Sequence, residues 1–237
     1  MKKLFVFALA MLLLCGCARQ EAPKPTLETL PPIEETTEPT TEPTTEPTEA
    51  PTEPADPIAD LLDSMSLEEQ VGQLFLVRCP ETNVTDLVET YHPGGILLFG
   101  RDIDGQTPES LTAAIASYQA AASVPMLIGV DEEGGTVCRV SSHEAFRSER
   151  FSSPRNLYAQ GGLDAIRKEE QEKCALLRPL GINVNLAPVC DIATDPQGFL
   201  YKRSLGESPE ITAEFVKTAV QAMRDGNIGS VLKHFPG

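Results

Sequence analysis

Charged side chains that can bind or polarise a ligand stand directly after apolar runs of this sequence. The last such group is Lys233-His234, which follows an apolar run and precedes a Phe-Pro-Gly turn. Another is Asp131-Glu132-Glu133, which follows residues 126–130 and is closed by Gly134-Gly135. Arg78, Arg101, Asp102 and Asp191 stand in comparable places, and Arg139 and Arg203 follow in the loops beyond the third and fourth runs. Their recurrence at run ends indicates one shared site.

Such a mixture of charges suits a polyhydroxylated ligand. Carboxylates accept hydrogen bonds from hydroxyl groups and guanidinium groups donate them in pairs, so the two kinds divide a ligand's hydroxyls between them. The plain alternatives are that Asp131 caps the glycine turn and that Arg139 and Arg203 form ordinary surface ion pairs. We expect Asp191 to support the other residues rather than contact the ligand.

Lys233 and His234 set a geometrical condition on the backbone. Successive residues of a regular strand point to opposite faces of the sheet. Both side chains therefore reach one pocket only if the chain departs from the regular pleat at residues 233–234. The sequence predicts such a departure.

The elements that position these residues alternate along the chain. The apolar runs are residues 73–78, 95–99, 126–130, 183–189 and 230–234, and helices are expected over residues 85–91, 107–122, 163–177 and 208–226. Ser66 and Glu69 form a capping-box pattern before the first run. Apolar strands separated by amphipathic helices indicate a parallel sheet, whose strand ends hold the working groups. The pattern leaves open a doubly wound sheet or part of a (β/α)8 barrel.

The N-terminus resembles a bacterial export signal. Lys2 and Lys3 precede eleven apolar residues, too few and wrongly flanked for a membrane span. Leu14-Cys15-Gly16-Cys17 is similar to a lipobox, which implies a signal peptide over residues 1–16 and lipidation of Cys17. The expected location is exported and anchored by lipid to the bacterial membrane as a cell-surface lipoprotein. The alternative is an ordinary cleaved signal with an incidental cysteine.

Residues 17–57 have the composition of a Thr/Glu/Pro-rich linker. The sequence TTEP begins at Thr36, Thr40 and Thr44, and regular prolines remove the amide donors that helices and sheets need. Residues 18–57 hold ten acidic and two basic side chains, a net of −8 within the chain's −16. The acidic balance therefore belongs largely to the linker, and it argues against a nucleic-acid partner.

Residues 58–237 are long enough for one sizeable core. Their four cysteines, Cys79, Cys138, Cys174 and Cys190, form no CxxC pair, and the three histidines are scattered. We therefore expect no structural metal site, and buried free thiols rather than disulfides.

The segments MSLEEQVGQLFLV, YHPGGILLFGRDI, LIGVDEEGG, GINVNLAPVCDI, RSLGESPE and KHFPG occur in the order found in family-three glycoside hydrolases. The sequence most resembles the bacterial β-N-acetylglucosaminidase branch of that family, across residues 60–237. Glu132, Cys138 and Leu205 depart from the residues usual there.

The resemblance implies a (β/α)8 barrel and a retaining β-N-acetylhexosaminidase that removes terminal β-linked N-acetylglucosamine, or a related sugar, from saccharides such as cell-wall fragments. It implies no cofactor. By position, Asp131, Arg139, Arg203, Lys233 and His234 match the residues with which the family holds the non-reducing sugar.

In the family, the general acid/base and the nucleophile lie beyond the KHFPG segment. We therefore expect about the first five β/α units, no catalytic residue in this chain and no turnover. Asp131 and Glu133 share one short loop and cannot flank both faces of a sugar, as the two carboxyl groups of a retaining enzyme must. The alternative function is a surface-tethered carbohydrate-binding module without catalysis.

Overall fold

The structure, a computed structural model, describes residues 56–236. The expected signal peptide, the lipidated Cys17 and the linker up to residue 55 lie outside the described residues. In the described part, no helix combines the length and the apolar character that crossing a membrane requires.

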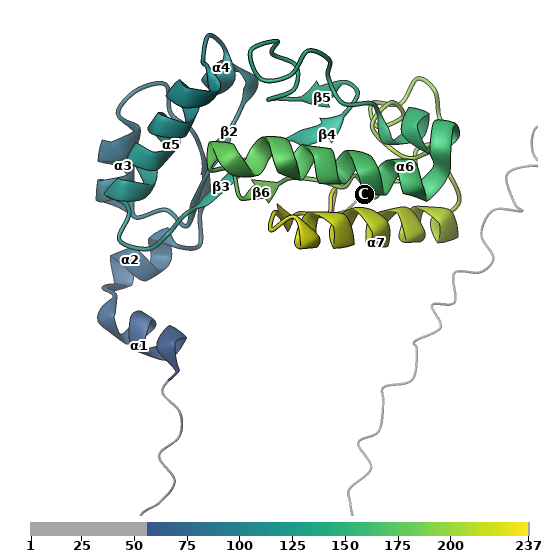
Figure 1. Cartoon of the computed structure of the whole chain (residues 1–237). Coiled ribbons are helices and arrows are strands. Elements are labelled where there is room, and N and C mark those ends of the chain that lie inside the picture. Colours follow the sequence, from purple (N-terminus) through teal and green to yellow (C-terminus); the bar gives the residue numbers. More distant parts are fainter. Residues whose placement is uncertain (1–55, 237) are drawn as a thin grey trace, which may run out of the picture. The chain divides into compact units, whose positions relative to one another are not determined.

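One parallel sheet carries the fold, and its strands follow one another in chain order (Figure 1). The strands, from one edge to the other, are β1 (Leu76–Arg78), β2 (Gly95–Leu98), β3 (Leu127–Val130), β6 (Val184–Asn185) and β7 (Gly229–Ser230). A doubly wound sheet reverses its order at a switch point, whereas a (β/α)8 barrel adds each strand beside the last. The observed order therefore selects the barrel type from the two alternatives.

Within residues 56–236, eight helical segments connect or precede these strands. They are α1 (Pro57–Ser64), α2 (Leu67–Gly72), α3 (Val84–Tyr91), α4 (Gly100–Ile103), α5 (Pro108–Ala121), α6 (Pro154–Leu177), η1 (Arg178–Leu180) and α7 (Pro209–Asp225). The capping box predicted at Ser66 and Glu69 is confirmed, since each side chain accepts the other's amide. Thr107 and Ser208 cap α5 and α7, each followed by a proline whose missing N–H is not needed there.

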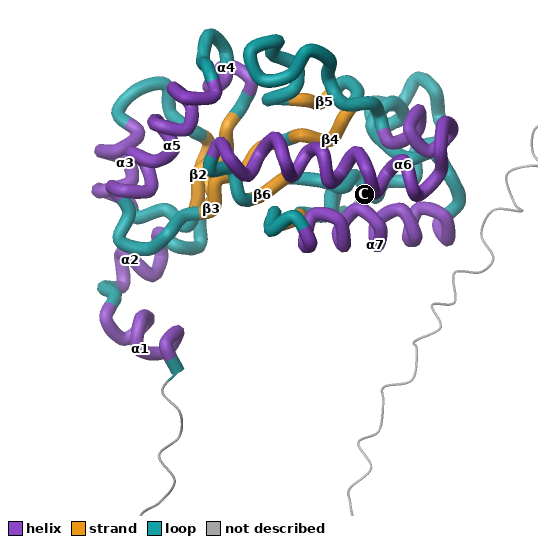
Figure 2. Tube along the Cα trace, in the orientation of Figure 1, coloured by secondary structure: helices purple, strands orange, loops and turns teal. Residues whose placement is uncertain are grey.

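The core lies between the sheet and its helices. Ile96 and Ile128 are fully buried, and Leu111 and Ile115 of α5 belong to the same apolar cluster. α6 and α7 lie side by side (Figure 1), and β2, β3 and β6 run next to one another (Figure 2). Phe215 of α7 adds its buried ring to this core.

The other face of the sheet carries Leu76, Gly95, Leu97, Leu127 and Gly129, and we call it the helix-free face. Large and small residues alternate between its neighbouring strands. A Cβ atom on Gly95 would lie 2.7 Å from Leu76 Cδ1 and 2.8 Å from Leu127 Cβ. A Cβ atom on Gly129 would lie 3.4 Å from Leu97 Cδ1. Barrel interiors are filled in this way, by layers of side chains from alternate strands.

Several elements differ from the predicted ranges. The runs 183–189 and 230–234 form only the two-residue strands β6 and β7, because Pro188 has no amide hydrogen and the Ala187 amide turns back to Asn185 O. Beyond β7, Lys233 pairs with Val189 in an isolated bridge. In the first run the strand begins only at Leu76, because the backbone amides before it donate hydrogen bonds to carbonyl oxygens of α2.

The helix expected over residues 163–177 begins nine residues earlier, at Pro154. Ser153 caps its first turn, and Gly161 and Gly162 leave helical geometry inside it. That glycine pair explains why the sequence pattern shows only the second half. The short hairpin of β4 (Glu132–Gly134) and β5 (Val137–Cys138) was not predicted.

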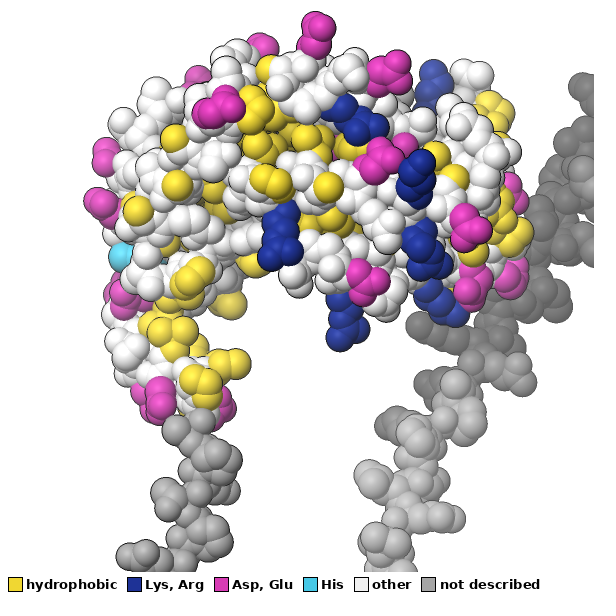
Figure 3. Space-filling view, in the orientation of Figure 1, with side chains coloured by type: hydrophobic (Ala, Val, Ile, Leu, Met, Phe, Trp, Pro, Cys, Tyr) yellow, Lys and Arg dark blue, Asp and Glu magenta, His cyan; other side chains and the backbone are white. Residues whose placement is uncertain are grey.

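Apolar side chains are exposed at the N-terminal end of the described part. Figure 3 shows them in yellow over α1 and α2. The exposed apolar residues there are Ile58, Leu61, Leu62, Leu67 and Val71. α1 buries none of its residues.

Candidate functional site

The carboxyl ends of β3 and β7 are joined by one lysine. Asp131 directly follows β3, and Lys233 lies beyond β7 in its bridge to Val189. The Lys233 ammonium lies 2.6 Å from Asp131 Oδ1 and 2.5 Å from Glu133 Oε1. All three side chains are at least 85% shielded from solvent, so these charges attract one another more strongly than they would in water.

Glu133 holds the second cation of the site. Its carboxylate accepts hydrogen bonds from Arg203 Nε at 2.9 Å and from Arg203 Nη2 at 2.7 Å, a bidentate pair. Burial raises the pKa of Glu133, but the hydrogen bonds and charges of Arg203 and Lys233 outweigh it and hold the pKa below its usual value. The hydrogen bond to Glu133 raises the pKa of Arg203. Glu133 is therefore an ionised anchor.

Local geometry explains how Asp131 and Glu133 come to face the same lysine. They are two residues apart on extended backbone, so their side chains project to one side. Glu132 projects to the other side, where its carboxylate accepts the Val140 amide at 2.7 Å. Gly134 ends this stretch with a φ of +101°, and a Cβ there would lie 2.1 Å from Ser152 O.

His234 is held from both sides of its ring. Nδ1 lies 2.7 Å from Asp191 Oδ2, and Nε2 lies 3.2 Å from Arg203 Nη2. The guanidinium only donates, so Nε2 accepts from Arg203 and Nδ1 donates to the carboxylate. The supporting role predicted for Asp191 matches this contact, and the departure from regular strand geometry predicted at residues 233–234 is confirmed, since β7 ends at Ser230.

Arg139 closes the cluster on the side of β2. Its Nη2 lies 3.8 Å from Asp131 Oδ2, and its guanidinium lies 5.7 Å from the centre of the Phe99 ring. The Nε of Arg139 is buried and has no hydrogen-bond partner among the described residues. A donor without a partner is costly inside a protein, and a ligand oxygen satisfies it.

The structure thus brings together Asp131, Arg139, Arg203, Lys233 and His234, the five residues predicted to bind a ligand. Their role in binding stays a prediction. Asp131 does not cap the glycine turn by its side chain, which faces Lys233.

Two other predicted strand-end charges have structural roles. Arg101 pairs with Glu81 and donates to Cys79 O at 2.7 Å, and Asp102 accepts the Phe99 amide at 2.7 Å at the start of α4. They stabilise the turn after β2. The anchoring role of Glu133 was not predicted, although its spacing of two residues from Asp131 indicated that both side chains face one way.

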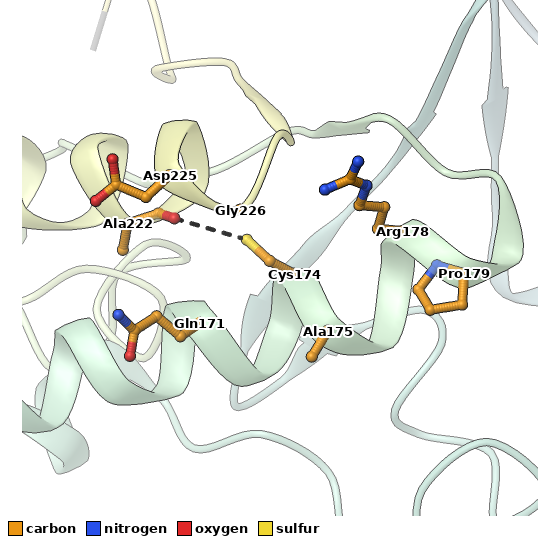
Figure 4. Close-up of a pocket in the computed structure, with 8 residues that line it drawn as sticks. All are labelled: Gln171, Cys174, Ala175, Arg178, Pro179, Ala222, Asp225 and Gly226. Atoms are coloured by element: carbon orange, nitrogen blue, oxygen red, sulfur yellow. Dashed lines mark hydrogen bonds between the residues drawn. The ribbon is translucent and has the colours of Figure 1, made fainter.

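A pocket of about 320 Å³ lies away from this cluster, between the C-terminal ends of α6 and α7 (Figure 4). Cys174 points from α6 toward Ala222 O of α7 in that pocket, at 4.0 Å. None of the five predicted residues lines it. The C-terminal ends of these helices lead into β6 and β7, so the pocket lies at the amino ends of the strands, where barrels carry stability rather than chemistry.

The buried cysteine thiols have low reactivity. Cys79, Cys138 and Cys174 are buried and unbridged, as expected, and burial raises the pKa of each to about 11. Cys190 is only half-buried, with its Sγ 3.1 Å from Lys233 O.

Sequence comparison relates residues 66–237 to the family described as "Glycosyl hydrolase family 3 N terminal domain". The Mycobacterium tuberculosis protein "Beta-hexosaminidase LpqI" is 30% identical over 175 residues, which are 73% of this chain and 44% of that protein. "Beta-hexosaminidase A" of Pseudoalteromonas piscicida is 31% identical over 165 residues, 65% of this chain and 26% of that protein. The chain spans less than half the length of either relative.

Solved structures show the same likeness. A glycoside hydrolase family 3 β-N-acetylglucosaminidase from Paenibacillus sp. str. FPU-7 has a TM-score of 0.66 and 30% identity, covering 73% of this chain and 34% of that one. M. tuberculosis LpqI has a TM-score of 0.65 and 28% identity, covering 76% of this chain and 51% of that one.

Proposed function

Because the chain belongs to the N-terminal domain family of family 3 glycosyl hydrolases, we propose that its charged cluster binds the non-reducing ring of a saccharide with β-linked N-acetylglucosamine. We propose further that the complete activity is retaining removal of that sugar. The names of the relatives, β-hexosaminidases and a β-N-acetylglucosaminidase, support this choice of sugar.

One observation carries the proposal. Lys233 bridges Asp131 and Glu133, Glu133 holds Arg203, and Arg203 meets His234, so residues from three strand ends form one network. Asp131 still has lone pairs free to accept a hydroxyl, and the guanidinium groups have N–H donors to spare. A ring with several hydroxyl groups matches this alternation of acceptors and donors.

The network serves binding rather than bond cleavage. Retaining hydrolysis needs a nucleophile and an acid/base about 5–5.5 Å apart across the scissile bond. Asp131 and Glu133 contact the same ammonium group from one loop, so they do not flank a bond. Both ring nitrogens of His234 are engaged, and neither is free to carry a proton to a leaving group. We therefore assign the catalytic steps to no residue of 56–236.

The same observation favours a second candidate, a carbohydrate-binding module that is held at the cell surface and does not catalyse hydrolysis. In both cases we propose export and a lipid anchor at Cys17, supported by the apolar segment and the lipobox-like sequence of the first 17 residues. The membrane is then a partner through the anchor, and carbohydrate is the ligand.

Calorimetric titration of the 237-residue chain with N-acetylglucosamine tests the binding role. We expect binding that D131N and K233M each weaken at least tenfold, because each removes a charged group proposed to contact the sugar and takes one partner from a buried ion-pair network. The exposed variant K202M serves as a control and should bind as the wild type does. Absence of binding, or equal binding by all variants, would contradict the proposal.

An assay with an aryl β-N-acetylglucosaminide then separates the two candidates from an active chain. Binding without turnover fits both candidates. If this chain hydrolyses the substrate and D131N leaves kcat unchanged, the chain contains catalytic groups that we have not assigned.

A further inference from the structure

Arg78 is a strand-end charge that the network above does not use. It ends β1 and pairs in register with Leu97 of β2, which in turn pairs with Gly129 of β3. Residues paired in register project to the same face, so Arg78 belongs to the helix-free face together with Gly129. Asp131 lies two residues beyond Gly129 and projects to that same face. Arg78 therefore lies on the same face of the sheet as Asp131, in register with the position two residues before it.

An aromatic ring connects Arg78 to the site. The Arg78 guanidinium lies 4.8 Å from the centre of the Phe99 ring, and the Arg139 guanidinium lies 5.7 Å from the same centre. Two cations thus share one ring, which attracts them without neutralising their charge. Arg139 is the residue that contacts Asp131.

The charges of the site balance without Arg78. The network joins three carboxylates to three Lys and Arg side chains, and His234 contacts Asp191. The members are Asp131, Glu133 and Asp191 against Arg139, Arg203 and Lys233. Within residues 56–236, Arg78 has no carboxylate oxygen within 4.0 Å and no hydrogen-bond acceptor, so it adds one positive charge that nothing described offsets.

We propose that Arg78 binds an anionic substituent, such as a carboxylate, sulfate or phosphate, on the saccharide that the charged cluster holds. This inference rests on the proposed function. Arg78 is exposed, its guanidinium lies against Phe99, and its paired donors match two oxygens of one anionic group. A neutral saccharide leaves that charge unused, whereas an anionic one pairs it.

The test compares neutral and anionic ligands on the 237-residue chain. The probes are the β-methyl glycoside of N-acetylglucosamine and its 6-sulfate, 6-phosphate and 3-O-carboxymethyl derivatives. At low salt we expect at least one anionic probe to bind about tenfold more tightly than the neutral one. The probe with the largest gain identifies the group and its position. Because Arg78 is exposed, the gain should shrink as salt screens it.

Three variants assign the effect. R78Q should bring the dissociation constants of the neutral and anionic probes together. R78K keeps the charge but loses the paired donors, so it should retain only part of the difference. R167Q removes an exposed arginine of α6 that has no ion pair among the described residues, and should preserve the full difference.

The outcomes separate this inference from the proposed function. Neutral and anionic probes that bind equally well would overturn the inference and leave the proposed function standing. An anionic preference that survives in R78Q would also overturn it, because Arg139 or Lys233 would then be the source. Failure of every probe to bind would overturn both.

Discussion

At the residue scale, Glu133 anchors the charged cluster, although it is not among the five residues proposed to bind the ligand. It is 2% exposed, and two of those five residues, Arg203 and Lys233, direct their charges at its carboxylate. Removal of one partner from a buried ion pair leaves the other charge desolvated and unpaired, which is far more costly than loss of a surface pair.

The variant E133Q should therefore lower the free energy of unfolding by about 3 kcal/mol at pH 7, measured by denaturant titration. The matched control is E214Q, whose Lys217 partner at 2.7 Å is largely exposed, and which should change stability by less than about 0.5 kcal/mol. Equal effects of the two variants would contradict the anchoring role of Glu133.

The same pair of proteins gives a pH prediction. The folded-state pKa of Glu133 lies below its ordinary value of 4.5, so this residue stabilises the fold above that pH. Its contribution falls as the pH drops through the folded-state pKa. The stability difference between wild type and E133Q should thus be constant near neutral pH and shrink below about pH 4.5. A difference that grows on acidification would refute this assignment.

At the element scale, the turn from β3 into β4 is the part that places Asp131 and Glu133. Lys173 of α6 is 2% exposed and donates to Glu133 O at 3.0 Å and to Glu170 Oε1 at 2.6 Å. Gly134 packs against the main chain at Ser152. A helix and a loop thus fix the backbone from which the two carboxylates project.

Substitution of Gly134 tests that packing. G134A introduces a Cβ 2.1 Å from Ser152 O at a φ of +101°, so we expect a loss of at least about 2 kcal/mol of stability and weaker saccharide binding. G100A is the control, because nothing lies within 4 Å of a Cβ there. It should leave stability unchanged or raise it by up to about 1 kcal/mol. Thermal unfolding curves of the two variants give the comparison.

Sequence patterns predict most elements because capping residues and apolar runs are local signals. Ser66, Thr107 and Ser208 fix three helix starts, and five apolar runs give the five strands. Strand order and strand length depend on which segments pair, and local patterns do not contain that information. Lys233 and Asp131 are in contact although they lie 102 residues apart in the sequence. The charges at the ends of the apolar runs predicted a shared site. Which side chains pair within that site depends on how the sheet folds.

At the scale of the whole described part, both outer strands of the sheet are exposed to association. β1 and β7 each pair on one side only within residues 56–236, and Leu232, just beyond β7, is 51% exposed. Unpaired strand edges with apolar side chains favour pairing between molecules.

We therefore expect the full chain to self-associate at micromolar concentrations, and L232K to reduce this association in sedimentation velocity experiments. V71K is the control, since Val71 is similarly exposed, at 45%, but lies on helix α2. If V71K had the same effect as L232K, general hydrophobicity rather than the strand edge would be responsible.

The binding role of the charged cluster is tested most directly by soaking crystals of the 237-residue chain with N-acetylglucosamine and determining the structure. We expect one sugar ring with hydroxyl groups within about 3.2 Å of Asp131, Lys233 and Arg203. A sugar bound instead in the pocket between α6 and α7, with these three side chains untouched, would contradict that role.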